Sequence, residues 1–197
     1  MASKIPLRTL IWLGLLVAVS LPLIWKAKNL DKKLFGRADT SAMVNKPAPD
    51  FALRTLSGET VSLSDYKQKK KVVVSFWASW CGPCRMELPE LQAFYEKYHP
   101  QHDTFEVLAI STDSSARAAE EYVKEAKLTF PVLMDADGKA GDAYGVEGIP
   151  MLFVIDENGK ILNVQEGFEG GLEFHLAGQL GFKVEFQAPV EKHDTSD

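Results

Sequence analysis

Residues 72–84 read VVVSFWASWCGPC, and this stretch determines how the rest of the chain is interpreted. Its continuous apolar run is typical of a central strand that is covered on both faces of a sheet. The residues from Cys81 to Tyr98 then read as a helix, with Pro89 inside it as the site of an expected kink. The two cysteines therefore lie where a buried strand gives way to a helix.

That position favours thiolate chemistry. Unpaired backbone N–H groups and the positive end of the helix dipole stabilise an anion at the start of a helix, so a thiol there ionises more readily than a free one. We expect Cys81 to be the exposed nucleophile, which forms a mixed disulfide, and Cys84 to resolve it. Gly82 and Pro83 keep the spacing short enough for a redox-active Cys81–Cys84 disulfide, and we expect no other cofactor.

The composition offers little support for a metal site. The chain has two cysteines, and two ligands are too few for a closed zinc site unless histidines join them. The histidines form no spaced ligand pattern, so we predict no metal and interpret all four as solvated: His99, His102, His175 and His193.

Charge is unevenly distributed along the chain. The net charge of −5 divides into +5 for residues 1–40 and −10 for the remainder. An acidic body argues against nucleic acid as a partner, because phosphate binding requires a basic surface. The basic N-terminal region instead suits an anionic membrane surface.

Residues 9–25 form an uncharged, mostly apolar run with basic residues on both sides. A span of about 17 to 20 residues crosses the hydrocarbon of a bilayer. We therefore predict a transmembrane anchor at 9–25, after a short cytoplasmic N-terminus at 1–8 and before a linker at 26–44. Ala18-Val19-Ser20 could serve as a cleavage site, but the apolar run continues to Trp25, which favours an uncleaved anchor.

The flanking charges conflict with export of the folded domain. Basic residues after the run outnumber Lys4 and Arg8 before it, and the positive-inside rule would then leave the domain in the cytoplasm. We still expect export, since long domains translocate largely regardless of charge. The expected export therefore rests on a family resemblance and not on the flanking charges.

One folded domain is expected over residues 45–183, with a flexible polar tail at 184–197. An N-terminal hairpin is expected, with strands at 51–53 and 60–63 and a turn at Ser57-Gly58. The order of elements fits an α/β layer with a mixed central sheet flanked by helices. The remaining strands are expected at 72–78, 105–111, 130–134, 151–155 and 161–165, and the helices at 81–98, 116–126, 139–144 and 171–180.

Two motifs resemble the thioredoxin superfamily. Trp80-Cys81-Gly82-Pro83-Cys84 matches the thioredoxin active site letter for letter, and Gly148-Ile149-Pro150 matches its cis-proline loop. The wider pattern, over about residues 45–182, is similar to the membrane-anchored, extracytoplasmic TlpA/ResA-like branch, which is related to AhpC/TSA proteins. The matching features are the N-terminal anchor, KPAPDF at 46–51, FWASWCGPCRMELP at 76–89, the extra segment between Ser111 and Phe130, and YGVEGIPMLFVIDENGKI at 144–161.

The resemblance implies a thioredoxin-like fold with an N-terminal β-hairpin and a central insertion. It also implies that Pro150 is cis and that the Ile149 backbone pairs with the substrate chain. We add Trp80, Gly82 and Pro83 to the predicted substrate-binding residues.

Ser75 and Glu87 distinguish this chain from thioredoxins. Thioredoxins carry a buried Asp six residues before the first cysteine, and Ser75 stands there, so that proton acceptor is missing. TlpA/ResA-like proteins instead have a Glu three residues after the second cysteine, which matches Glu87. Since Cys84 and Glu87 share a helix face, we predict that a half-buried Glu87 is the catalytic base that takes the Cys84 proton. The alternative is a solvated helix glutamate.

By resemblance, the chain is expected to be a protein-disulfide reductase held in the cell inner membrane by a single span, with its catalytic domain on the periplasmic or extracytoplasmic side. A membrane thiol donor of CcdA/DsbD type would re-reduce it, and apocytochrome c, in cytochrome c maturation, is the favoured protein substrate.

Two alternatives stay open. The PAPDF opening at 47–51 also resembles peroxiredoxins, which would make the protein a thiol peroxidase. Their peroxidatic cysteine usually follows a Thr or Ser three residues earlier, and Ala78 holds that place here. The second alternative is a binding or chaperone module that uses the groove without turnover.

Overall fold

A computed structural model of the chain describes residues 40–183. The predicted N-terminus at 1–8, the anchor at 9–25, most of the linker at 26–44 and the tail at 184–197 lie outside the described residues. Within the described part, no helix is both long and apolar enough to cross a membrane. The anchor at 9–25 therefore stays a prediction.

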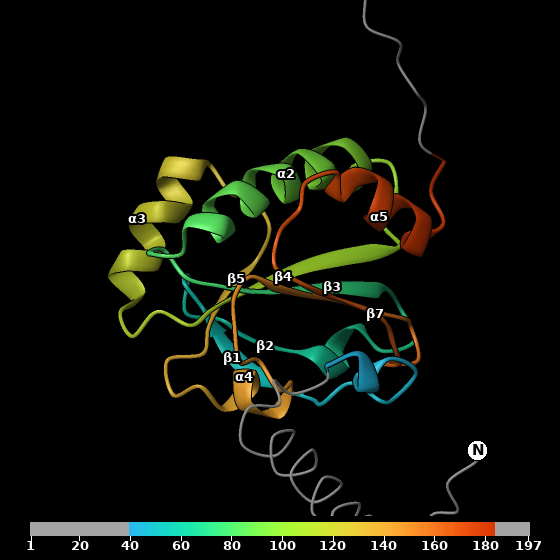
Figure 1. Cartoon of the computed structure of the whole chain (residues 1–197), viewed down its shortest axis with the longest axis horizontal. Helices are drawn as coiled ribbons and strands as arrows, with labels where there is room; N and C mark the ends of the chain where they lie inside the picture. Colours follow the sequence, from blue (N-terminus) through green and yellow to red (C-terminus); the bar gives the residue numbers. More distant parts are fainter. Residues whose placement is uncertain (1–39, 184–197) are drawn as a thin grey trace, which may run out of the picture. The chain divides into compact units, whose positions relative to one another are not determined.

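The predicted strands and α-helices follow one another along residues 40–183 in the expected order, with two short 3-10 helices in addition (Figure 1). The strands are β1 (Ala52–Thr55), β2 (Thr60–Ser62), β3 (Lys71–Trp77), β4 (Phe105–Ser111), β5 (Val132–Met134), β6 (Met151–Ile155) and β7 (Ile161–Glu166). The helices are η1 (Thr40–Met43) and η2 (Leu63–Tyr66), which are 3-10 helices, and α2 (Gly82–Tyr98), α3 (Ala116–Ala126), α4 (Lys139–Ala143) and α5 (Leu172–Leu180).

These strands form one mixed sheet, in the order β2-β1-β5-β4-β3-β6-β7. β3, β4 and β5 run parallel, and β6 is antiparallel to β3. In β3, Val74 pairs with Leu108 on one side and with Phe153 on the other. The predicted mixed sheet is confirmed, and the strand that leads to the cysteines lies inside it.

Helices cover both faces of the sheet, which explains why β3 reads as an unbroken apolar run. Val73 and Trp77 pack with α2, α3 and α5 on one face, whereas Val72 and Phe76 pack with η2 and α4 on the other. Figure 1 shows α2, α3 and α5 above the sheet and α4 below it. Because side chains alternate along a strand, Ser75 faces α2.

Two strand boundaries differ from the prediction by two residues, each for a local reason, and the other differences are of one residue. The strand predicted at 130–134 begins two residues later, because Pro131 has no N–H to donate to the ladder. The first strand extends to Thr55, whose carbonyl and hydroxyl oxygens accept hydrogen bonds from Gly58 and Glu59 in the turn. Gly58 has a φ of +93°, which a residue without a side chain adopts readily.

The folded domain includes the end of the predicted linker at 26–44. Met43, in η1, packs against the core beneath the sheet. The chain then follows the edge of β7, where the N–H of Asn45 bonds to the carbonyl of Ile161 and the N–H of Ile161 to the carbonyl of Lys46. These bonds satisfy backbone groups at the edge of the sheet.

The expectation of a solvated His99 is wrong. Its ring stacks on Tyr95, with the ring centroids 4.2 Å apart, and meets Phe105 edge-on. His99 directly follows α2, and its ring joins the aromatic side chains that the helix packs against β4.

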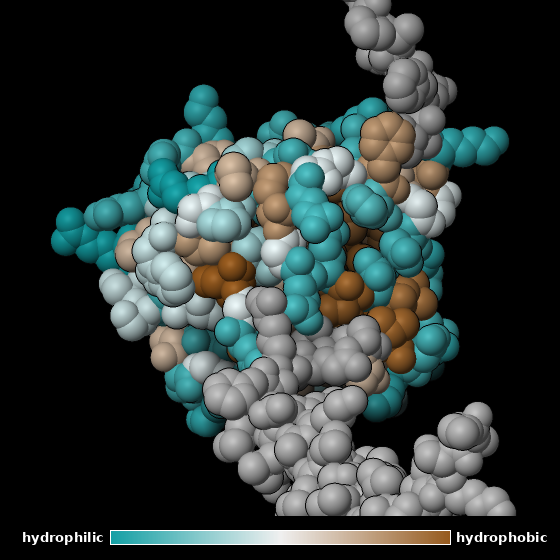
Figure 2. Space-filling model, viewed as in Figure 1, coloured by the Kyte–Doolittle hydropathy of each residue, from teal (hydrophilic) through white to brown (hydrophobic). Residues whose placement is uncertain are grey.

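Hydrophilic side chains cover most of the described surface seen in Figure 2, with small hydrophobic areas between them. Among the described residues, the large hydrophobic side chains left exposed are those of Trp80, Met86 and Phe174. Two of these lie close in sequence to the cysteine pair, so exposed apolar groups are concentrated around the loop after β3.

Candidate active site

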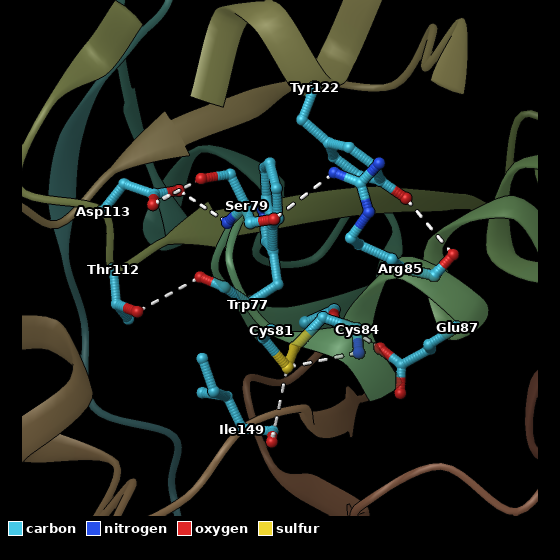
Figure 3. Close-up of a disulfide and its surroundings, with 11 residues drawn as sticks. Trp77, Ser79, Cys81, Cys84, Arg85, Glu87, Thr112, Asp113, Tyr122 and Ile149 are labelled. Carbon is cyan, nitrogen blue, oxygen red and sulfur yellow. Dashed lines mark hydrogen bonds between the residues drawn. A yellow bond between two sulfur atoms is a disulfide. The ribbon is translucent and has the colours of Figure 1, made fainter. Parts of the chain in front are cut away.

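The loop after β3 delivers two cysteines to the start of α2. Cys81 caps the helix, and its sulfur accepts a 3.2 Å hydrogen bond from the backbone N–H of Cys84. A disulfide joins the two residues, whose Cα atoms are 5.3 Å apart. Figure 3 shows it at the N-terminal end of the helix. A thiolate at Cys81 would meet the same N–H group and the positive end of the helix dipole.

The two cysteines differ in their access to solvent. Cys81 keeps 5% of its surface exposed, whereas Cys84 keeps none. Gly82 and Pro83, between them, are exposed. Pro83 lies in the first turn, where its missing N–H removes no helical hydrogen bond. The expectation of an exposed Cys81 is therefore wrong in degree, because the residue is mostly buried. Of the two cysteines, it is still the one with surface that a substrate disulfide can reach.

A second loop, which precedes β6, lies against the disulfide. The Ile149–Pro150 peptide bond is cis, and the carbonyl oxygen of Ile149 lies 3.6 Å from the sulfur of Cys81 (Figure 3). Pro150 is buried, and its carbonyl accepts a 2.8 Å hydrogen bond from the N–H of Gly167. The structure thus brings together the two motifs on which the thioredoxin resemblance rests.

Trp80 lies at the surface next to Cys81. Its side chain is 73% exposed, although tryptophan is highly buried on average. Trp77, three residues earlier, is fully buried and packs on the ring of Tyr122. Trp80 is therefore available to contact another molecule, whereas Trp77 belongs to the core.

Glu87 lies on the buried face of α2, one turn after Cys84, and Figure 3 shows its carboxyl group on the same side of the helix. Its Oε1 accepts a 2.7 Å hydrogen bond from the hydroxyl of Ser75 on β3. Its Oε2 has no hydrogen-bond partner among the described residues.

Burial raises the pKa of Glu87 to about 7; the hydrogen bond from Ser75 lowers it in part, and the charge of Glu90 adds to the rise. The expectations of a half-buried or a solvated glutamate are both wrong, because the side chain has no exposed surface. The group can exchange a proton near neutral pH.

A buried aspartate that sequence reasoning missed holds the loop before Cys81. Asp113, which follows β4, accepts hydrogen bonds from the N–H of Ser79 at 2.9 Å and from its hydroxyl at 2.8 Å. It also accepts one from the hydroxyl of Ser111 at 2.9 Å. Because β3 and β4 are parallel neighbours, their carboxyl ends meet at one edge of the sheet. That rule is the signal that could have paired Ser79 with Asp113.

Arg85, also missed, ties the start of α2 to α3. Its guanidinium lies 4.4 Å from the centre of the Tyr122 ring and pairs with the carboxylate of Glu125. It also donates to the carbonyl oxygen of Ser79 at 3.4 Å. The central insertion, which contains α3, therefore supports the loop that carries the cysteines.

The polar groups gathered here suit thiol chemistry. Within residues 40–183, no group of three or more His, Cys, Asp or Glu side chains is arranged to hold a metal ion. Two sulfurs at a helix N-terminus and a buried carboxyl group are the groups that thiol–disulfide exchange with proton transfer requires.

Comparison with known proteins gives consistent matches. Residues 44–164 match the model of the AhpC/TSA family. The thioredoxin-like protein YneN of Bacillus subtilis (strain 168) is 35% identical over 133 residues, which cover 68% of this chain and 77% of YneN. The thiol-disulfide oxidoreductase ResA of Bacillus thuringiensis subsp. konkukian is 36% identical over 124 residues, which cover 63% of this chain and 70% of ResA. The crystal structure of StoA from Bacillus subtilis matches with a TM-score of 0.58 at 30% identity, over 67% of this chain and 96% of StoA.

The fold and these matches define a protein-disulfide oxidoreductase of the thioredoxin superfamily. More narrowly, the chain belongs to the AhpC/TSA family. Its similarity to ResA and YneN makes it a TlpA/ResA-like member. The predicted family and class of enzyme are confirmed.

Proposed function

We propose that the protein reduces disulfide bonds in other proteins through Cys81 and Cys84. One observation carries the proposal: the sulfur of Cys81 lies at the N-terminus of α2, and Cys81 keeps 5% of its surface exposed while Cys84 keeps none. A sulfur anion at that point is stabilised by the N–H of Cys84 and by the helix dipole. Burial of Cys84 keeps its thiol for the second step.

The reaction consists of two thiol–disulfide exchanges. The Cys81 thiolate attacks one sulfur of the substrate disulfide, and the other substrate sulfur leaves as a thiolate. The Cys84 thiol then loses its proton and attacks the Cys81 sulfur, so that the Cys81–Cys84 disulfide forms and the substrate's second sulfur leaves. The substrate gains the two electrons that the cysteine pair loses.

In this proposal the proton of Cys84 passes to Glu87. The two residues are three positions apart and share one face of α2. The Oε2 atom has no partner among the described residues and can accept the proton. A general base works best when its pKa lies near the operating pH, and the pKa of Glu87 is about 7.

A polypeptide is the substrate class that the surface favours. Trp80 directly precedes the cysteine pair and Met86 follows it, and their side chains are 73% and 57% exposed. Exposed apolar and aromatic side chains are typical of contacts with other proteins. A small disulfide would make little use of them, whereas the chain around a protein disulfide could cover them.

We further propose that residues 9–25 hold the protein in the cell inner membrane, with the catalytic domain on the periplasmic side. A membrane thiol donor of CcdA/DsbD type would return two electrons to the Cys81–Cys84 disulfide, and apocytochrome c would be the substrate. The apolar run with basic flanks supports the anchor, and family resemblance supports export. A membrane-impermeant maleimide should label reduced Cys81 in intact spheroplasts, and labelling only after lysis would contradict the orientation.

Reduction of insulin disulfides by the reduced protein tests the main proposal. The wild type should reduce insulin, Cys81→Ser should be inactive, and Cys84→Ser should accumulate a mixed disulfide. Equal insulin reduction by Cys81→Ser would contradict the proposal. Rapid consumption of hydrogen peroxide without insulin reduction would instead indicate a peroxidase. A Cys81→Ser/Cys84→Ser variant that still complements a deletion would indicate a binding module.

A further inference from the structure

Ser75 and Glu87 face each other in the core behind the disulfide. Ser75 lies on β3 with no exposed surface, and its hydroxyl donates to Glu87 Oε1 at 2.7 Å. A serine cannot serve as a carboxylate base at this position, but it can donate a hydrogen bond to one. The bond joins the central sheet to the helix that carries both cysteines.

We propose that Ser75 is a positioning residue for the resolving step: it holds Oε1 of Glu87 and leaves Oε2 to receive the proton of Cys84. The inference rests on the proposed role of Glu87 as the base. A hydrogen bond to a charged acceptor is stronger than a neutral one, and Oε2 has no competing partner among the described residues. The two oxygens of one carboxylate therefore have different tasks.

Two features around Glu87 disfavour its charged form, and the hydrogen bond from Ser75 acts against both of them. Burial disfavours the charged carboxylate. On the same helix, Glu90 adds a negative charge that acts in the same direction, and its own Oε2 accepts a hydrogen bond from the N–H of Leu172 at the start of α5. Ser75, from β3, opposes both effects, because a donor to the charged form stabilises that form.

Loss of the Ser75 hydroxyl should change the pH at which Glu87 ionises, but not the chemical steps of the reaction. The proton still passes from the Cys84 sulfur to the carboxylate, the Cys81–Cys84 bond forms, and the substrate sulfur leaves. However, the carboxylate loses the donor that stabilises its charge, so a smaller fraction of Glu87 is ionised at a given pH. The pH dependence of substrate release should therefore move upward.

The test compares the wild type with Ser75→Ala, Ser75→Val and Ser75→Thr in the reduced full-length protein. Val and Thr have nearly the same shape and differ in the hydroxyl group. Carbon-13 NMR of the Glu87 carboxyl group gives its titration midpoint, and single-turnover reduction of insulin gives the rate of product release against pH.

We expect the midpoint to rise by about one pH unit in Ser75→Ala and Ser75→Val. Release at about pH 6 should then slow about tenfold, because the ionised fraction falls by that factor. Ser75→Thr should stay close to the wild type. A wild-type midpoint in Ser75→Val would overturn the proposal. If Ser75→Ala does not fold, the Val and Thr pair still decides, since both residues suit a strand.

Glu87→Gln separates this inference from the proposed function. If Glu87→Gln removes the pH-dependent step and Ser75→Val keeps the wild-type midpoint, Glu87 is the base and Ser75 does not position it. If Glu87→Gln releases product at the wild-type rate from about pH 6 to 9, the role of Glu87 as the base is wrong and the inference fails with it.

Discussion

The hydroxyl of Tyr122 on α3 donates a hydrogen bond to the backbone carbonyl of Arg85 on α2, at 3.3 Å. In an uninterrupted helix, that carbonyl would accept the N–H of the residue four positions later. This residue is Pro89, which has no N–H. The proline therefore frees an acceptor next to Cys84, and the central insertion supplies the donor. The helix continues through Pro89 to Tyr98.

An N–H at position 89 should make Tyr122 less important for stability. Tyr122→Phe leaves the carbonyl of Arg85 without its donor and should lower the free energy of unfolding by about 1 kcal/mol. In a Pro89→Ala background, the alanine N–H satisfies this carbonyl, so the same change should cost close to nothing. Urea unfolding of the four proteins gives the coupling. Equal costs in both backgrounds would show that Tyr122 stabilises the fold in another way.

Glu87 should make the folded state less stable as the pH rises. Its pKa is about 7 in the folded protein, against 4.5 for the free side chain. Between these values the folded state holds the proton and the unfolded state does not, so stability falls as the pH rises through this window. Glu87→Gln cannot lose this proton, so its stability should not fall in this way. As the pH rises, the free energy of unfolding of Glu87→Gln should increase relative to that of the wild type by up to about 3 kcal/mol.

Urea unfolding of the oxidised proteins at about pH 5 and about pH 8 measures this effect. Glu96→Gln is the matched control, because Glu96 lies on the same helix but is exposed. Its stability should follow that of the wild type at both pH values. A difference between Glu87→Gln and the wild type that does not change with pH would show that Glu87 ionises as readily in the folded state as in the unfolded one.

The fold was predictable where the pattern is local. An unbroken apolar run predicts a strand covered on both faces of the sheet. Cys81 and Pro83, which follow that run, predict the start of a helix. The burial of Glu87 is not local, because a glutamate next to Arg85 and Met86 also fits an exposed helix face. Whether Glu87 is buried depends on which strand of the sheet lies beneath α2, here β3.

The pairing of Ser79 with Asp113 depends on strand order. The two residues are 34 positions apart, and each lies in a loop. They meet because β3 and β4 are parallel neighbours in the sheet. A single sequence shows that both strands exist, but their adjacency follows from the packing of the whole domain.

Asp113→Ala should destabilise the protein more than Asp113→Asn. Alanine leaves the N–H of Ser79 and two hydroxyl groups without an acceptor, and unsatisfied buried groups cost about 1 to 3 kcal/mol each. Asparagine keeps one acceptor oxygen, and its amide group can donate to a hydroxyl that turns to accept. Urea unfolding should show a loss of about 2 kcal/mol or more for alanine and a smaller loss for asparagine.

Asp137→Ala serves as the control for this pair, because Asp137 is an exposed aspartate whose salt bridge with Lys139 lies at the surface. Surface ion pairs contribute between about 0 and 1 kcal/mol. If Asp113→Ala costs no more than Asp137→Ala, the hydrogen bonds of Asp113 do not hold the loop before Cys81.

Met86 should matter for protein substrates and much less for small disulfides. Its side chain is 57% exposed near the cysteines, and that of Phe174 on α5 is equally exposed, which makes Phe174→Ala a matched control. Truncation of an interface side chain costs about 1 kcal/mol, which corresponds to about a fivefold rise in KM. We therefore expect Met86→Ala to raise KM for insulin about fivefold, with the reduction of oxidised glutathione changed less than about twofold. If Met86→Ala and Phe174→Ala gave equal KM values for insulin, polypeptide binding would not depend on the apolar side chain of Met86. The loss of an equally exposed side chain away from the cysteines would then have the same effect on KM.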